Sequence, residues 1–142
     1  MSAATIIKTT TQRTHAYTRA CMSAFANVGT LGPQDIWNGV SVRAVHGERI
    51  TLGVVELDAN ALVPEHSHEN EQLGIVLQGS MTFRVGDESR ELGPGGTWNI
   101  PANVPHEVTA GPEGAVVLDV FAPTRDDWSQ FEPQAPREPR WP

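Results

Sequence analysis

The sequence predicts an all-β protein whose strands form a mostly antiparallel barrel or sandwich. The chain has 142 residues, which is the size of one domain. Its 13 glycines and 11 prolines disfavour long helices and favour short strands between tight turns. Turn signals recur about every eight to twelve residues along the middle of the chain. Connections this short leave no room for the helices that join parallel strands.

The middle segment, residues 37–124, contains the expected barrel. Its first two strands meet at Gly47-Glu48, a hairpin turn lies at Gly86-Asp87, and a glycine-rich turn follows at residues 93–96. Between these turns the apolar and β-branched residues gather in short runs. We expect strands over Val40–His46, Arg49–Leu57, Leu62–His68, Gln72–Leu77, Met81–Val85, Glu88–Leu92, Thr97–Ile100, Glu107–Ala110 and Ala115–Phe121.

The two ends of the chain are expected to be irregular arms, residues 1–36 and 125–142. The N-terminal arm is rich in Thr, Ala and Ser and shows no sustained period, although a short helix near Ala16–Val28 is compatible with its residues. The C-terminal arm carries four prolines, which exclude a central strand or a long helix. Trp128, Phe131 and Trp141 are its candidate docking points.

Charge and composition exclude several classes of partner. Ten Lys and Arg residues face 17 Asp and Glu residues, a formal charge of −7, so no basic stripe is available for nucleic acid. No apolar run approaches the length of a membrane span. Cys21, the single cysteine, has no partner within the chain, which fits a reducing compartment. We expect a cytoplasmic protein whose partner is a small molecule.

The histidines form a candidate metal site. His66 and His68 are two residues apart, so an extended strand points both imidazoles to the same face. His106 comes from a later strand, and imidazole is the commonest protein ligand for first-row transition metals. A fourth, oxygen ligand is available from Gln72 or from its neighbour Glu71.

Two stretches that contain these histidines resemble the conserved motifs of the cupin family. Residues 60–79 resemble the first motif, with its His-x-His pair, and residues 95–110 resemble the second, which supplies one more histidine. The resemblance implies a cupin double-stranded β-helix, that is, a jelly-roll β-barrel. It also implies one divalent transition metal ion (Zn, Ni, Fe or Mn) held by His66, His68, His106 and a fourth residue.

The motifs depart from the family pattern at three informative positions. Asn60 and Asn103 stand where the family has glycine, and asparagine is the residue that best tolerates the positive φ of such turns. Gln72 stands where the family has glutamate. Gln72 is separated from each of the two preceding histidines by an even number of positions, so an extended strand would point all three side chains to the same face. We therefore favour Gln72 over Glu71 as the fourth ligand.

A ligand set of three imidazoles and one amide has an electrostatic consequence. All four groups are neutral, so a bound divalent ion would keep its full charge and attract anionic oxygen strongly. The same set would stabilise an oxidised, trivalent metal poorly. These properties favour isomerisation, ring opening or lyase chemistry over oxygen activation.

Asp119 is the second candidate for chemistry. It interrupts the apolar run Ala115–Phe121, where a carboxylate is costly unless it is paired or functional. Arg125 follows the Ala122-Pro123 bend and can return to the barrel mouth. Two interpretations are open: a structural Asp119–Arg125 ion pair, or a general acid–base at Asp119 with Arg125 as a carboxylate clamp. Asp126 and Asp127 are expected to be solvated surface charges.

The later motif Asp-x-Phe-x-Pro-x-Arg, together with His-Ser-His and Glu-Gln-x-Gly, resembles the single-domain cupins that linearise unsaturated uronates. The resemblance implies that Asp119, Phe121 and Arg125 line the active site and that the substrate is a small, oxygen-rich anion. Asp119 and Arg125 are then the catalytic candidates, and Phe121 and Arg125 the substrate-binding ones.

Other functions on the same barrel stay open. Phe83, Trp98 and Phe121 would suit an aromatic ligand, as in a polyketide cyclase or a quercetinase-like dioxygenase. A non-catalytic small-molecule binding protein is the third hypothesis, because a fold alone does not fix a function. We also expect a homodimer, in which pairing of the arms or of edge strands would bury their exposed groups.

Overall fold

The computed structural model describes residues 23–142. It contains eight strands and two 3₁₀ helices of 3 and 5 residues. Within this described part of the chain, no helix is long and apolar enough to cross a membrane. The elements are η1 (Val28–Thr30), β1 (Gln34–Trp37), β2 (Val40–His46), β3 (Thr51–Leu57), β4 (Leu62–His66), β5 (Glu71–Val85), β6 (Glu88–Leu92), β7 (Thr97–Ile100), β8 (His106–Ala122) and η2 (Asp126–Gln130).

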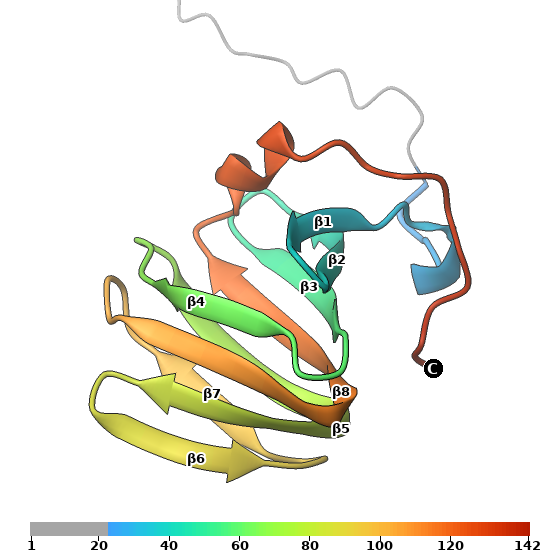
Figure 1. Ribbon diagram of the computed structural model, residues 1–142. Helices are drawn as coiled ribbons and strands as arrows, with labels where there is room; N and C mark the ends of the chain where they lie inside the picture. The colour runs from blue at the N-terminus through green and yellow to red at the C-terminus, as the bar shows by residue number, and fades with distance from the viewer. Residues whose placement is uncertain (1–22) are drawn as a thin grey trace, which may run out of the picture.

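The strands form one antiparallel sheet that curls into a jelly-roll barrel (Figure 1). The hydrogen-bonded order is β1-β2-β3-β8-β5-β6, with β4 paired to β8 and β7 paired to β5. β8 is central because its first half pairs with β4 and its second half with β3, while β5 runs along both halves. This topology confirms the predicted all-β, mostly antiparallel barrel.

β5 and β8 are each one bent strand where the sequence analysis expected two. The register of the β5–β8 ladder shifts on both sides of Gly79, which pairs with Ala115. Gly79 and Gly114 both have φ of +75°, and a Cβ at Gly79 would clash with the Gly114 carbonyl. The two glycines therefore let both strands turn the barrel corner without leaving the sheet.

The other strands agree with expectation to different degrees. β2, β6 and β7 have the predicted bounds. β1 was not predicted: its first three residues lie in the segment assigned to the N-terminal arm, and it forms by pairing with β2, Gln34 opposite Val42. Residues 23–27 are not helical, and the rest of the segment near Ala16–Val28, with Cys21, lies outside the described residues.

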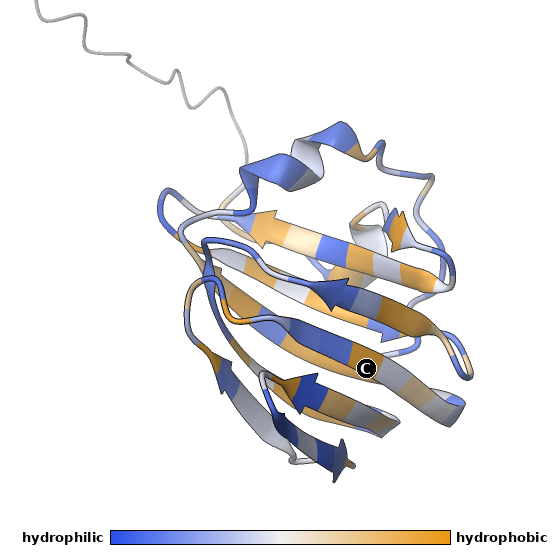
Figure 2. Cartoon of the chain, turned by 60° about the vertical axis from the view of Figure 1, so that its left-hand side comes forward, coloured by the Kyte–Doolittle hydropathy of each residue, from blue (hydrophilic) through white to orange (hydrophobic). Residues whose placement is uncertain are grey.

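The apolar faces of the strands fill the barrel interior. In β2 and β3 alternate residues such as Val42, Val55 and Leu57 are almost completely buried, as the alternating hydropathy in Figure 2 illustrates. Trp128, from η2 in the C-terminal arm, joins this core with 3% exposure. The docking expected of this tryptophan is therefore confirmed.

The rest of the C-terminal arm lies against β1–β3 and is held by a buried carboxylate. Glu56 on β3 forms an ion pair with Arg43 on β2, and both side chains are 1% exposed. From the arm, Arg137 Nη1 donates to Glu56 Oε2 at 3.1 Å, and the Arg140 backbone N–H donates to Glu56 Oε1 at 3.2 Å. Figure 1 shows the arm in red, passing over this end of the barrel.

Candidate metal and active site

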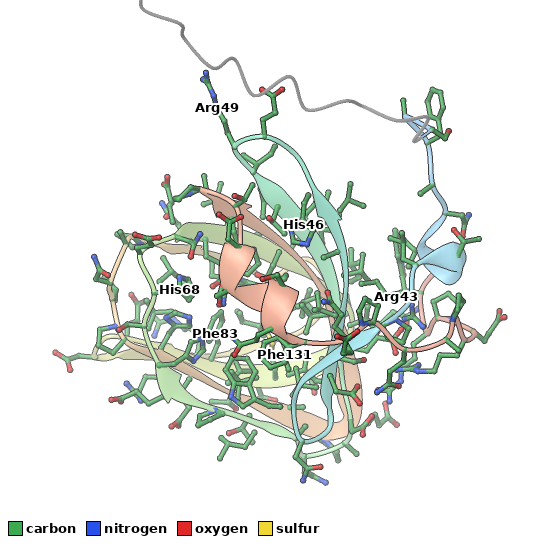
Figure 3. All side chains as sticks on the ribbon, turned by 90° about the horizontal axis from the view of Figure 1, so that it is seen from above. Arg43, His46, Arg49, His68, Phe83 and Phe131 are labelled. Atoms are coloured by element: carbon green, nitrogen blue, oxygen red, sulfur yellow. The ribbon has the colours of Figure 1, made fainter. Side chains whose placement is uncertain are left out.

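Three histidines from two neighbouring strands converge inside the barrel. His66 ends β4, His68 follows it, and His106 begins β8 directly opposite His66 in the ladder. Their ring centroids are 4.2 to 5.7 Å apart, and one nitrogen from each ring lies within 4.8 Å of the others. In Figure 3, His68 and Phe83 lie inside the barrel, whereas Arg49 lies at the tip of the hairpin that joins β2 and β3. The fold therefore brings together the three histidines that were predicted to bind a metal.

The two asparagines at glycine positions have the conformations expected of them. Asn60 has φ of 59° and Asn103 has φ of 65°, and these are the non-glycine residues with positive φ among the described ones. The backbone N–H of Asn103 donates to the carbonyl of His68 at 2.8 Å. The left-handed turn at Asn103 thus ties the loop before β8 to the loop that carries His68.

Backbone carbonyls fix the tautomer of all three rings. Each Nδ1–H donates to a carbonyl, so each Nε2 keeps its lone pair for a ligand. His106 Nε2 is buried and has no hydrogen-bond partner in the described structure, which is the kind of orphaned acceptor that a metal satisfies. The acceptors are the carbonyls of Pro64 (2.8 Å from His66), Asn70 (3.0 Å from His68) and Val104 (2.8 Å from His106).

The environment keeps these imidazoles neutral. Burial lowers the pKa of His66, His68 and His106, and the positive charge of Arg125 lowers it further; for His106 the pKa falls to about 4. Metals bind the neutral imidazole, so at neutral pH the three rings need no deprotonation before they bind an ion.

Gln72 on β5 stands beside the trio with its amide oriented. Its Oε1 lies 3.2 Å from His68 Nε2, and its Nε2 donates to Asp119 Oδ1 at 2.8 Å. The carboxylate thereby fixes the carbonyl end of the amide toward the histidines. Glu71, the alternative, is exposed on the other face of the strand. Three imidazole nitrogens and one amide oxygen fit a divalent transition metal ion.

Asp119 lies in the middle of β8, buried to 6% exposure behind Gln72. Its Oδ1 accepts hydrogen bonds from Gln72 and from Trp98 Nε1, the latter at 3.0 Å. Burial raises the pKa of this carboxyl to about 6, although both hydrogen bonds and the charge of Arg125 act in the opposite direction. Its second oxygen, Oδ2, receives neither of these two bonds. Asp119 can therefore exchange a proton near neutral pH.

Gly74 provides the room for this contact. It pairs with both Trp98 and Asp119 across the sheet, and a Cβ at Gly74 would overlap the Trp98 ring. The Trp98 indole therefore occupies the space beside the glycine, and its Nε1 donates to the carboxylate. The sequence Gln72-Leu73-Gly74 thus contains both the candidate fourth ligand, Gln72, and the glycine that leaves room for Trp98 and Asp119.

The Asp119–Arg125 ion pair, one of the two interpretations that the sequence left open, is not formed. Instead, Arg125 Nε donates to Asp127 Oδ1 at 2.9 Å and Nη2 donates to Oδ2 at 2.7 Å. The tight turn of η2 returns Asp127 to the arginine two residues earlier, so Asp127 is not merely the solvated charge that was expected. The guanidinium also stacks on Phe121 and Trp128, at 4.8 and 4.5 Å from the ring centroids.

These groups share one small cavity of about 60 Å³. All three aromatic side chains that were predicted to contact a ligand line it, with Phe83 and Trp98 packed edge to face at 5.1 Å. Trp37, at the start of the predicted barrel segment, also lines the cavity, whereas Trp128 was expected as a docking point of the C-terminal arm and not as a wall of the cavity. The principal lining residues are Trp37, His66, Gln72, Phe83, Trp98, His106, Asp119, Phe121, Arg125 and Trp128.

Comparison with known proteins supports the resemblance to cupins that the sequence motifs indicate. The profile of the cupin domain matches residues 53–121, whereas no curated protein sequence matches the chain. The structure of KdgF from Halomonas sp. is similar, with a TM-score of 0.69 at 29% identity over 75% of this chain and 98% of that one.

More distant structures share the fold. An RmlC-like cupin from Shewanella frigidimarina aligns with a TM-score of 0.70 at 22% identity, over 75% of this chain and 96% of that one. Oxalate decarboxylase from Bacillus subtilis aligns at 0.61 and 22% identity, over 72% of this chain and 30% of the larger protein. Residues 53–121 therefore match a cupin domain, and the jelly-roll barrel that contains them carries the three-histidine site.

Proposed function

We propose that this protein is a metal-dependent isomerase of carbohydrate metabolism that opens cyclic 4,5-unsaturated uronates to linear keto sugars. The observation that carries the proposal is the side chain of Asp119, a carboxyl with a pKa of about 6 in one cavity with His66, His106 and the buried guanidinium of Arg125. Similarity to KdgF at 29% identity supports it.

The metal site would be formed by His66, His68, His106 and Gln72. A divalent ion bound there supplies a concentrated positive charge for an anionic substrate oxygen. None of the four side chains cancels that charge. Zinc, nickel, iron and manganese all suit such a donor set.

The chain's own residues supply the remaining chemistry. Arg125 would bind the substrate carboxylate, which orients the sugar in the cavity. As the bond between C1 and the ring oxygen breaks, Asp119 Oδ2 would take the proton of the C1 hydroxyl, and C1 becomes an aldehyde. The electron pair of the broken bond stays on the ring oxygen as an enolate, and delivery of the same proton to C4 gives the ketone at C5. No atoms are gained or lost, and a carboxyl with a pKa near 6 is suited to both transfers.

The aromatic walls support one alternative, a dioxygenase or polyketide cyclase that acts on a flat aromatic substrate. Phe83, Trp98 and Phe121 are all buried beside the histidines. A dioxygenase would consume oxygen with iron bound and with a flavonol as substrate. A pure binding protein would retain ligand affinity but convert nothing.

The deciding experiment is metal analysis of the purified protein followed by an assay of unsaturated uronate. Loss of the ultraviolet absorbance of the C4–C5 double bond should require the metal, stop with a chelator and resume when metal is added back. A control variant, His46→Ala, removes an exposed histidine outside the metal site and should leave the metal content and the metal requirement unchanged. A metal-loaded protein that leaves the absorbance unchanged would refute the proposed reaction.

We also propose a homodimer that forms through the outer face of the sheet. Four apolar residues lie in register across β2, β3, β8 and β5, namely Val45, Leu52, Val120 and Leu73. Val45, Leu52 and Leu73 are 49%, 37% and 47% exposed, and such a stripe is typical of an association surface. Light scattering should give twice the chain mass for the natural protein and a monomer for Leu52→Glu.

A cytoplasmic location completes the proposal. The single cysteine, Cys21, requires no oxidising compartment for folding of the chain. Cell fractionation would test this location.

A further inference from the structure

We infer that Asp127 is the positioning residue that holds Arg125 in place as the anion clamp of the cavity. The inference rests on the proposed function only in requiring that the ligand carry a carboxylate. Asp127 lies outside the cavity and touches neither the histidines nor Gln72, so its effect on a ligand would pass through the guanidinium.

The two hydrogen bonds between these residues occupy only one edge of the guanidinium. Asp127 accepts from Nε and Nη2, in the parallel geometry that fixes the plane of an arginine most strongly. The arginine side chain is 7% exposed and lines the cavity, whereas the aspartate side chain is 52% exposed. Nη1 therefore stays outside this pair and is available to a ligand on the cavity side.

The remaining contacts hold the arginine but do not set its rotation. Its backbone N–H donates to Thr51 Oγ1 at 3.0 Å, and its carbonyl accepts from the Trp128 N–H at 3.1 Å. Phe121 and Trp128 contact the guanidinium through their rings, which permits in-plane rotation. The carboxylate fork is the directional contact among these.

Charge and position predict opposite effects for loss of this carboxylate. Asp127 is a negative group near an anion site, so its charge alone weakens anion binding, and neutralising it would strengthen binding. Its geometry preorganises the clamp, so losing the fork would weaken binding. The sign of the change therefore separates a positioning role from a purely electrostatic one.

The test measures binding of D-glucuronate, a stable saturated uronate, to the zinc-loaded protein by calorimetry, with D-glucose as the uncharged comparison. Asp127→Asn should weaken glucuronate binding by about tenfold, and Asp127→Glu should recover part of it. Asp126→Asn is the matched control: it makes the same charge change one residue away, where the aspartate accepts only from Thr124 Oγ1. This control should stay within about twofold.

A second measurement does not depend on the ligand. The Nε–H signal of Arg125 in a nitrogen-15 NMR spectrum should be sharp and slow to exchange in the natural protein and in Asp126→Asn, and lost in Asp127→Asn. Unchanged or tighter glucuronate binding by Asp127→Asn would overturn the inference, as would a natural protein that binds glucuronate no better than glucose. Glucuronate binding with the expected losses but no turnover of unsaturated uronate would refute the proposed reaction and leave this inference standing.

Discussion

Two buried carboxylates, one on each face of the same barrel wall, behave in opposite ways. Asp119 faces the cavity with 6% exposure, and Glu56 faces the C-terminal arm with 2% exposure. Burial opposes ionisation of both. For Asp119 it prevails and raises the pKa to about 6. For Glu56 the hydrogen bonds of Arg140 and Arg137 and the charge of Arg43 overcome it, and the pKa is lowered.

The difference shows that the number and charge of the donors, together with the depth of burial, decide what a buried acid can do. Asp119 accepts from an amide and an indole, which orient it but leave its proton exchangeable. Glu56 accepts from guanidinium groups, which hold it ionised over the whole physiological range. One environment permits proton transfer, and the other stabilises the attachment of a chain segment.

The largest expected effect is on stability, from Glu56→Gln. This change leaves Arg43 buried without its partner, which costs about 3 to 5 kcal/mol when a buried pair is broken. Urea unfolding should show the loss, and Asp58→Asn, which removes an exposed partner of Arg140, should lose less than about 1 kcal/mol. Equal losses in the two variants would contradict a structural role for Glu56.

The pH dependence of stability should have opposite signs at the two acids. In the metal-free protein, Asp119 holds its proton more tightly when folded, so its contribution favours folding at low pH and is lost as pH rises from about 4 to 6. The expected loss is about 3 kcal/mol, at ~1.4 kcal/mol per pKa unit. The contribution of Glu56 is present above pH 4.5 and is lost as pH falls through its lowered pKa.

Unfolding measured against pH for the natural protein, Asp119→Asn and Glu56→Gln isolates each acid, because titrations that the proteins share cancel in the differences. The three histidines are among these shared groups, and their lowered pKa values make the metal-free protein less stable as pH falls below about 6.5. Differences of the same sign for both acids would refute the comparison.

Asp119→Asn should reduce kcat by about 100-fold while the protein stays folded. The amide cannot accept and return a proton, although it fills the same space. Metal content and the melting temperature serve as controls, because Gln72 must still be oriented by the new side chain. Full activity of a folded, metal-loaded variant would exclude Asp119 as the proton-transfer group.

The two acids also differ in how far the sequence could reveal them. Asp119 stands out because apolar residues surround it on its own strand, and its partner Gln72 lies in a recognisable motif. Glu56 does not, because its partners Arg137 and Arg140 are 81 and 84 residues away and meet it only when the arm folds back. The Arg125–Asp127 pair was missed although it is local, since the turn that joins them carries no glycine or proline signal.

The strands, too, could be predicted from the sequence where local residues define them, and not where contacts between distant residues do. β2, β6 and β7 are bounded by their own turn residues, and their ends were predicted. The continuity of β5 through Gly79 depends on Gly114, far along the chain, so two strands were expected there. β1 depends on pairing with β2 and has too few residues for a periodic signal.

The smallest expected effect comes from Trp98→Phe, which keeps an aromatic ring over Gly74 but removes one of the two donors to Asp119. The lost hydrogen bond lowers the pKa of Asp119 at present, so its removal should raise that pKa and move the acidic limb of the kcat profile to higher pH. One neutral hydrogen bond contributes about 0.5 to 1.5 kcal/mol. This corresponds to about 0.4 to 1.1 pKa units, so kcat at pH 7 should fall by up to about twofold. Trp37→Phe is the matched control, because Trp37 lies 4.9 Å from the His66 ring and makes no bond to the carboxylate. A limb that moves equally in both variants would mean that packing, and not the indole N–H, sets the acidity of Asp119.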